Sequence, residues 1–183
     1  MRTQEAAQRY AKAFYTLATE KNKLDTALNE LREFSCAVRK DPGLKYFFSS
    51  PIITAEDQRA ALDKFFEKKP LSEETRSLLH LLAEKRRMNL LSAIAAAFQS
   101  VVDESRGVAR GQVVSASTLS PEERQKLEVT ISRHTNKKAV LEYHEDKSLL
   151  GGLVARVGSF TFDDSLDTQL RVMKEVLTKR RSH

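Results

Sequence analysis

The sequence is poor in the residues that mark several common classes of protein. Its 183 residues include one cysteine and no tryptophan, with only 6 glycines and 4 prolines. A single cysteine excludes an internal disulfide and is typical of a protein from a reducing compartment. Cys36 lies between apolar neighbours in a helical pattern, so we expect a small buried side chain there rather than a reactive thiol.

Long apolar runs are missing as well. No stretch approaches the roughly 20 residues that a membrane-spanning helix needs. The first residues, MRTQEAAQRYAKAF, lack the long apolar core of a signal peptide. We therefore expect any association with a membrane to depend on partner proteins.

The sequence also lacks the spacings that mark catalytic, cofactor and metal sites. Its glycines form neither a phosphate-binding loop nor a dinucleotide-binding fingerprint, so we interpret Gly151-Gly152 as a backbone turn. A single cysteine cannot complete a zinc site with the histidines in the usual patterns. The four histidines show no ligand spacing: His80, His134, His144 and His183. We predict no catalytic, cofactor-binding or metal-binding residues, and a protein that is not an enzyme.

Helical periodicity dominates the first 105 residues. Apolar residues recur three and four positions apart, without the alternation of a strand. This predicts about six helices in a compact bundle, of which Thr54 and Ser72 are expected to cap two. The expected helices cover residues 3–19, 24–40, 44–49, 55–67, a segment after 72, and 88–106.

The first predicted helix has two neighbouring apolar stripes. Such a width favours either a helix in the centre of the bundle or a helix with one edge inside and one edge facing a partner. One stripe holds Ala6, Tyr10, Ala13 and Leu17, and the other holds Ala7, Ala11, Phe14 and Ala18. The fifth helix is similar: Leu78 and Leu82 are expected in the core, and Thr75, Leu79 and Ala83 form a second face.

The periodicity changes at Gly107. Residues 108–117 and 138–144 alternate like strands, and Ser120-Pro121 begins a helix between them. Residues 153–157 and 160–162 read as a hairpin, and Asp163 and Asp164 are expected to cap a final helix with Leu166, Leu170, Met173 and Leu177. We predict a mainly α protein, with a helical bundle over 1–105, a small α+β domain over 106–183 and a hinge at Arg106-Gly107.

Three stretches carry a family resemblance. They are DKSLLGGLVARVGSFTFDDSL at 146–166, RYAKAFYTLA at 9–18 and LAEKRRMNLL at 82–91. In this order they resemble the delta subunit of F-type ATP synthases, the family of the mitochondrial oligomycin-sensitivity-conferring protein. The sequence departs from the family at Asp164, where glycine is usual, which raises the question of the turn geometry there.

The resemblance implies a stator subunit. Such a subunit links the catalytic α3β3 head to the b-type subunits of the peripheral stalk, and supports proton-driven ATP synthesis without catalysing it. The bundle would receive the N-terminal segment of an α subunit, and the α+β domain would contact the b helices. The resemblance further implies a peripheral membrane protein on the cytoplasmic side of a bacterial inner membrane, held there through the complex.

The resemblance places a helix-binding groove between the first and fifth helices. Its expected walls are Tyr10, Ala11, Phe14 and Ala18 on one side, and Leu79 and Ala83 on the other. Contacts with the stalk are expected from Val154, Arg156, Met173 and Val176. We also expect the α+β half to be the less stable one by itself, because its sheet is short.

A different interpretation is an RNA-binding or ribosome-associated factor. The net charge of +6 and the pI near 9.5 would suit it. However, the basic residues are interleaved with acidic ones, and no aromatic-rich strand of the kind that stacks on RNA bases is present. We therefore expect no nucleic-acid partner.

Overall fold

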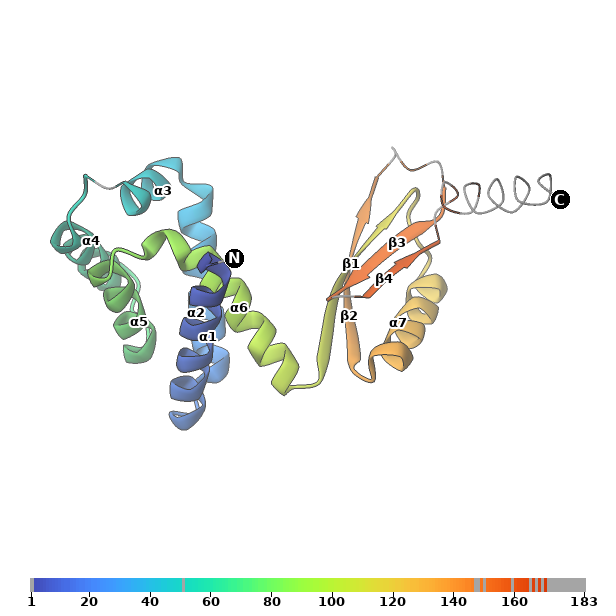
Figure 1. The fold of residues 1–183 in the computed structure, drawn as a ribbon, viewed down its shortest axis with the longest axis horizontal. Coiled ribbons are helices and arrows are strands. Elements are labelled where there is room, and N and C mark those ends of the chain that lie inside the picture. The colour runs from blue at the N-terminus through green and yellow to red at the C-terminus, as the bar shows by residue number, and fades with distance from the viewer. Residues whose placement is uncertain are drawn as a thin grey trace. The chain divides into compact units, whose positions relative to one another are not determined.

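The computed structural model describes residues 2–50, 52–146, 149, 151–158, 160–164, 166, 168 and 170 (Figure 1). The chain divides into two compact units, Met1–Val102 and Asp103–His183. Each unit has a hydrophobic core of its own. The fold is mainly helical with one small sheet, which confirms the predicted fold class.

The first unit is a bundle of α-helices that closely follows the predicted segments. Strand pairing among the described residues is confined to the second unit. The elements are α1 (Arg2–Glu20), α2 (Leu24–Lys40), α3 (Pro42–Ser49), α4 (Ala55–Lys68), α5 (Glu73–Glu84), the short 3-10 turn η1 (Met88–Leu90) and α6 (Leu91–Ser105).

Both predicted helix starts in this unit are confirmed, but a side-chain capping bond is present at only one of them. The Thr54 hydroxyl accepts a hydrogen bond from the backbone N–H of Asp57, and the Asp57 carboxylate accepts from the backbone N–H of Thr54. This reciprocal pair satisfies two N–H groups that the helix leaves open. Ser72 precedes α5 as predicted, but its side chain makes no capping bond and instead donates to Glu30.

The core of the first unit draws on every helix of the bundle. Its largest fully buried side chains include Phe98, Leu31, Leu62, Leu79, Leu82 and Ile94. Removing each such side chain from water contributes about 1.5–3 kcal/mol to folding. Cys36 of α2 is only half-buried, so the expectation of a buried thiol is wrong.

The second unit is a four-stranded sheet with one described helix packed on it. The strands lie in the order β2-β1-β3-β4. β1 and β2 pair in parallel, with α7 as the crossover between them, while β1–β3 and β3–β4 pair antiparallel. The elements are β1 (Val108–Ser115), α7 (Pro121–Thr135), β2 (Lys138–Glu145), β3 (Leu153–Val157) and β4 (Phe160–Asp163).

Helix α7 covers one face of this sheet. Ser120 and Glu123 form a capping box at its start, as the sequence predicts for Ser120. Leu127 and Ile131 of α7 pack into the core of the unit with strand residues of alternating register: Ala109, Val113, Ala139, Ala155 and Val157. Leu141, Tyr143, Leu153 and Phe162 pack against the same core. The strand residues that alternate with these two sets stand on the opposite face, which no described helix covers.

The backbone of this unit is closely packed at Gly111, has a positive φ at Gly152 and has no positive φ at Asp164. A Cβ atom on Gly111 would lie 2.3 Å from Cγ2 of Val157 and 2.6 Å from the carbonyl oxygen of Arg156. Gly111 is therefore the close approach that its place in a strand predicts. Gly152 has a φ of 82°, which favours glycine. Asp164 has no positive φ, so its departure from the family glycine needs no left-handed backbone.

The last described residues belong to the predicted final helix. Leu166, Thr168 and Leu170 are helical. The Asp163 carboxylate, at the end of β4, accepts a hydrogen bond of 2.9 Å from the Thr168 hydroxyl. The rest of that predicted helix, including Met173 and Leu177, lies outside the described residues.

Candidate partner-binding surface

The structure brings the six predicted groove residues together, but it places most of them in the interior. Only Tyr10 is partly exposed. The other five are buried in the core of the first unit: Ala11, Phe14, Ala18, Leu79 and Ala83. They therefore join α1 and α5 to the rest of the bundle and do not form an open groove in this structure.

The stripe of α1 that supplies most of the expected groove wall is the buried one; we call its residues, Ala7, Ala11, Phe14 and Ala18, the small-residue stripe. The small-residue stripe faces inward, and the ring of its Phe14 packs against Phe98 with 4.8 Å between the ring centroids. The other stripe ends at the surface, where Ala13 and Leu17 are exposed. Periodicity identifies both stripes but does not show which one faces the core, because each has the same helical spacing.

Contacts at both ends show that α1 and α5 run antiparallel. In the middle of α1, the Tyr10 hydroxyl accepts a hydrogen bond of 3.0 Å from Nη1 of Arg87, which lies just beyond the end of α5. Just after the end of α1, Nζ of Lys23 lies 3.2 Å from the carboxylate of Glu74 in the first turn of α5. The second half of α1 therefore lies beside α5.

An exposed apolar seam follows from this arrangement. Leu17 is 37% exposed and Leu81 is 40% exposed. Leu17 lies two turns after Tyr10, and Leu81 lies one turn before Lys85. The guanidinium of Arg87, two residues after Lys85, lies over the Tyr10 ring, 5.7 Å from its centroid. We call Tyr10, Ala13, Leu17 and Leu81 the α1/α5 seam.

Leu17 and Leu81 are candidates that the sequence patterns did not identify. The expected groove wall used mainly the other stripe of α1, and the second face of α5 was expected around Leu79. The available signal was the leucine content of α5, where leucine covers more of the helix than one buried face requires.

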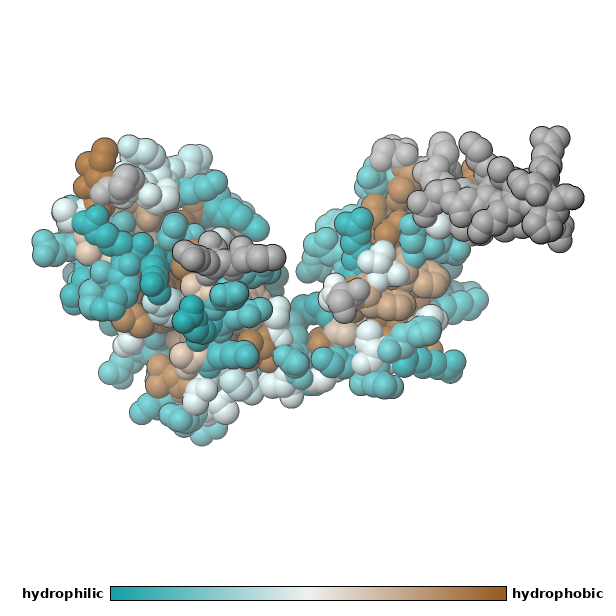
Figure 2. All heavy atoms as spheres, viewed as in Figure 1, coloured by the Kyte–Doolittle hydropathy of each residue, from teal (hydrophilic) through white to brown (hydrophobic). Residues whose placement is uncertain are grey.

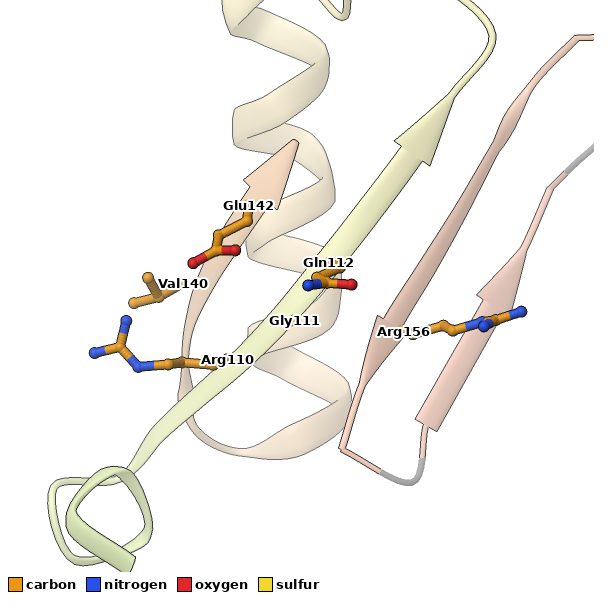
Figure 3. A pocket seen from close by; sticks show the side chains of 6 residues that line it. All are labelled: Arg110, Gly111, Gln112, Val140, Glu142 and Arg156. Atoms are coloured by element: carbon orange, nitrogen blue, oxygen red, sulfur yellow. The ribbon is translucent and has the colours of Figure 1, made fainter. Parts of the chain in front are cut away.

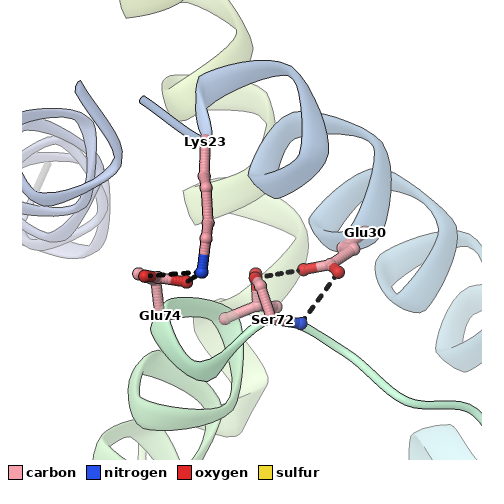
Figure 4. A network of polar contacts seen from close by, with 5 residues as sticks. Lys23, Glu30, Ser72 and Glu74 are labelled. Atoms are coloured by element: carbon pink, nitrogen blue, oxygen red, sulfur yellow. Dashed lines mark hydrogen bonds and ion pairs between the residues drawn. The ribbon is translucent and has the colours of Figure 1, made fainter. Parts of the chain in front are cut away.

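A polar network fastens the start of α5 to α2 and to the connection between α1 and α2 (Figure 4). Glu30 of α2 accepts hydrogen bonds from the backbone N–H and the hydroxyl of Ser72, at 2.8 and 2.5 Å. Lys23 pairs with Glu74, whose side chain is only 6% exposed. The pKa of Glu74 is lowered, first by a hydrogen bond from its own backbone N–H and then by Lys23. The network thus anchors the start of α5 close to the end of α1.

The open face of the sheet is the second candidate surface (Figure 3). It contains a hollow of about 290 Å³ that is bordered by charged side chains from three strands, among them Arg110, Glu142 and Arg156. Nε of Arg110 lies 2.6 Å from Oδ2 of Asp103, which pairs that guanidinium within the unit. Arg156 is exposed.

Two of the four predicted stalk contacts lie on this face. Val154 and Arg156 alternate with the buried Ala155 and Val157, so their side chains stand on the side away from α7. Met173 and Val176 lie outside the described residues. The face therefore presents one apolar and one cationic position of the predicted set.

Side chains that could bind a metal ion or take part in catalysis are scattered over the part of the chain that the structure describes. No group of three or more His, Cys, Asp or Glu residues there is placed to hold a metal ion. Nε2 of His80 lies 3.1 Å from Oδ1 of Asp63, and its ring packs edge-on to Phe66 at 5.4 Å. His80 thus lies at the edge of the core. Over the same residues, every helix is too short or too polar to cross a membrane.

Comparison with known proteins gives full-length matches. A family model described as "ATP synthase delta (OSCP) subunit" matches residues 6–177. A protein of Bdellovibrio bacteriovorus named "ATP synthase subunit delta" is 39% identical over 98% of this chain and 99% of its own length. One of the same name from Desulfosudis oleivorans is 36% identical over 94% of both chains.

A solved structure has the same fold. A chain in the cryo-EM structure of the Toxoplasma gondii mitochondrial ATP synthase hexamer matches with a TM-score of 0.74 and 22% identity. The match covers 94% of this chain and 97% of that one. The RNA-binding alternative receives no support from any of these matches.

Proposed function

Because the chain belongs to the ATP synthase delta (OSCP) subunit family, and is therefore a stator component of that enzyme, we propose that it ties the N-terminal segment of an α subunit to the b-type subunits of the peripheral stalk. The bundle would hold the α segment, and the α+β unit would hold the stalk. The work is mechanical, since a stator resists torque through stable interfaces. The proposal therefore assigns the chain no catalytic step of its own.

The α1/α5 seam is the observation that carries this proposal. It offers Leu17 and Leu81 as exposed apolar side chains on two helices that the Glu74 and Glu30 bonds hold together. An amphipathic helix can lay its apolar face along such a pair of helices. The proposed surface lies directly outside the predicted groove walls, because those walls fill the space between the helices.

The open face of the sheet supports the stalk contact. Arg156 and Val154 stand there side by side in register with Thr161 and Asp163 of β4. A partner that offers carboxylates and apolar side chains would complement them. We propose that the b-type subunits bind across this face, and that the chain reaches the cytoplasmic side of a bacterial inner membrane only through the complex.

A peptide titration tests the seam. A synthetic peptide of the α N-terminal segment is titrated into the full-length chain by calorimetry. Saturable binding is expected, and Leu17→Glu or Leu81→Glu should weaken it by about tenfold or more, because each places a charge in an apolar contact.

A matched control uses Val129→Glu, which puts the same charge on an exposed apolar position of α7 in the other unit. This variant should bind the peptide like the unaltered chain. The assignment of the seam as the binding surface is wrong if the binding of the peptide does not saturate, or if neither seam variant changes the affinity of the chain for the peptide.

A further inference from the structure

Helix α3 is flanked by two hollows in the first unit. One has a volume of about 420 Å³, lies between α2, α3 and the start of α6, and has an apolar floor that includes Val38, Phe48 and Met88. The other has a volume of about 300 Å³ and is lined almost entirely by apolar side chains, among them Phe34, Phe47 and Phe65. Volumes of this size accept a few side chains of a partner. The α1/α5 seam contributes none of the lining residues.

The rim of the larger hollow is cationic. Arg39 of α2 and Lys45 of α3 line it, together with serine and asparagine side chains and without any carboxylate. Across the described residues, neither of these two cations has a hydrogen bond or ion pair through its side chain. The nearby Asp41 carboxylate is used to cap α3, because it accepts from the backbone N–H groups of Gly43 and Leu44.

The surface between and beyond the hollows is apolar. Tyr46 is 67% exposed and Ile52 is 81% exposed, and Leu44 is exposed as well. These are three of the five large hydrophobic side chains exposed among the described residues of the first unit. Figure 2 shows hydrophobic side chains gathered over the connection between α3 and α4. We call Arg39, Leu44, Lys45, Tyr46 and Ile52 the α3 surface.

We infer that the α3 surface binds an acidic amphipathic segment of a partner protein. The apolar side chains of the partner segment enter the two hollows and cover Tyr46 and Ile52, while the carboxylates of that segment face Arg39 and Lys45. The partner segment is expected to carry negative charge, because Arg39 and Lys45 are unpaired and the rim that they share has no carboxylate. The extent of the surface favours a segment over a small molecule, since a ligand in one hollow would leave Tyr46 and Ile52 exposed.

The inference rests on the proposed function, because the partner is sought within the assembled ATP synthase. A photo-cross-linking amino acid is placed at Asn89, which is exposed and lines the larger hollow. The full-length chain is assembled into membranes that carry ATP synthase, irradiated and analysed by mass spectrometry. The expected adduct is a peptide with Asp or Glu beside apolar residues at helical spacing.

Charge reversal shows whether the cations select that partner. Arg39→Glu/Lys45→Glu should lower the yield of the adduct by about tenfold. The control Lys64→Glu/Lys68→Glu makes the same change of charge on exposed positions of α4 and should leave the yield unaltered. Circular dichroism of both double variants confirms that they fold.

The two levels of the hypothesis fail separately. If the unaltered chain is retained with the ATP synthase but yields no adduct, a lipid adduct, or an adduct that charge reversal does not reduce, the inference about the α3 surface is wrong and the proposed function stands. If the chain is not retained with the ATP synthase at all, both are wrong.

Discussion

Phe14 and Phe98 face each other across the core of the helical unit, with ring centroids 4.8 Å apart and ring planes inclined by 48°. Both rings are buried. This contact between the first and the sixth α-helix turns the small-residue stripe of α1 inward. It therefore decides which edge of α1 remains available to a partner.

The burial of Phe14 predicts a stability defect. Phe14→Ala should lower the free energy of unfolding by about 3–5 kcal/mol, because it leaves a cavity against Phe98. Leu17→Ala, on the exposed stripe, should cost about 1 kcal/mol or less. Urea denaturation followed by circular dichroism measures both. A Phe14→Ala variant as stable as the unaltered chain would mean that α1 is turned the other way.

Glu74 predicts a loss of stability in acid. Its pKa in the folded protein is lowered below the ordinary value of 4.5, chiefly by its own backbone N–H and then by Lys23. The charged carboxylate therefore stabilises the fold fully above that ordinary pKa, and this contribution disappears as the pH falls through the lowered pKa of the folded state. Melting temperatures of Glu74→Gln should fall less steeply than those of the unaltered chain below pH 4.5.

The partner of Glu74 permits a finer measurement. Lys23→Met should remove only the smaller part of this pH dependence, because the backbone hydrogen bond to Glu74 remains. A Lys23→Met profile as flat as that of Glu74→Gln would contradict this order of causes.

Tyr143 is expected to ionise at a higher pH than an ordinary tyrosine. Its pKa is raised to about 12, first by burial and then by the charge and the hydrogen bond of the nearby Glu128 carboxylate. The hydroxyl of Tyr143 lies 3.2 Å from Oε1 of Glu128. Ultraviolet titration should show a phenol that ionises after the others, absent in Tyr143→Phe and shifted to lower pH in Glu128→Gln. The neutral phenol favours the folded state, so this contribution to stability is lost as the pH rises from 10 towards the raised pKa.

Gly111 predicts that the sheet does not tolerate a single added methyl group. In Gly111→Ala the new Cβ would meet Cγ2 of Val157 and the carbonyl oxygen of Arg156. Such overpacking costs about 1–3 kcal/mol or more when backbone has to move. Hydrogen exchange should report faster opening of β1 and β3 than in the unaltered chain.

Gly43→Ala is the matched control for that substitution. Its Cβ would meet only the Oδ1 atom of Asp41, at 3.1 Å, which is the end of a flexible side chain. The change should alter stability by about 1 kcal/mol or less. Equal effects at Gly43 and Gly111 would show that the close approach in the sheet is not the cause.

The helix and strand segments could be predicted because their signals are local. The capping boxes at Thr54 and Ser120 each join residues three positions apart, and the alternation at 153–157 needs no distant partner. Ser72 shows where such reasoning stops. Its hydroxyl has the sequence context of a cap, yet it donates to Glu30, which is 42 residues away. The half-buried Glu30 carboxylate, which folding brings close, is the stronger acceptor.

The sequence by itself determined the family, the two kinds of structure and the two apolar stripes of α1. Only the tertiary structure decided which stripe is buried, because both have the same period and the choice depends on Phe98, Leu79 and other side chains far along the chain. It thereby moved the candidate α-binding surface from the buried Ala11 and Ala18 to the exposed Leu17 and Leu81. Periodicity specifies which residues share a face of a helix, and packing specifies whether that face is turned to the core or to the solvent.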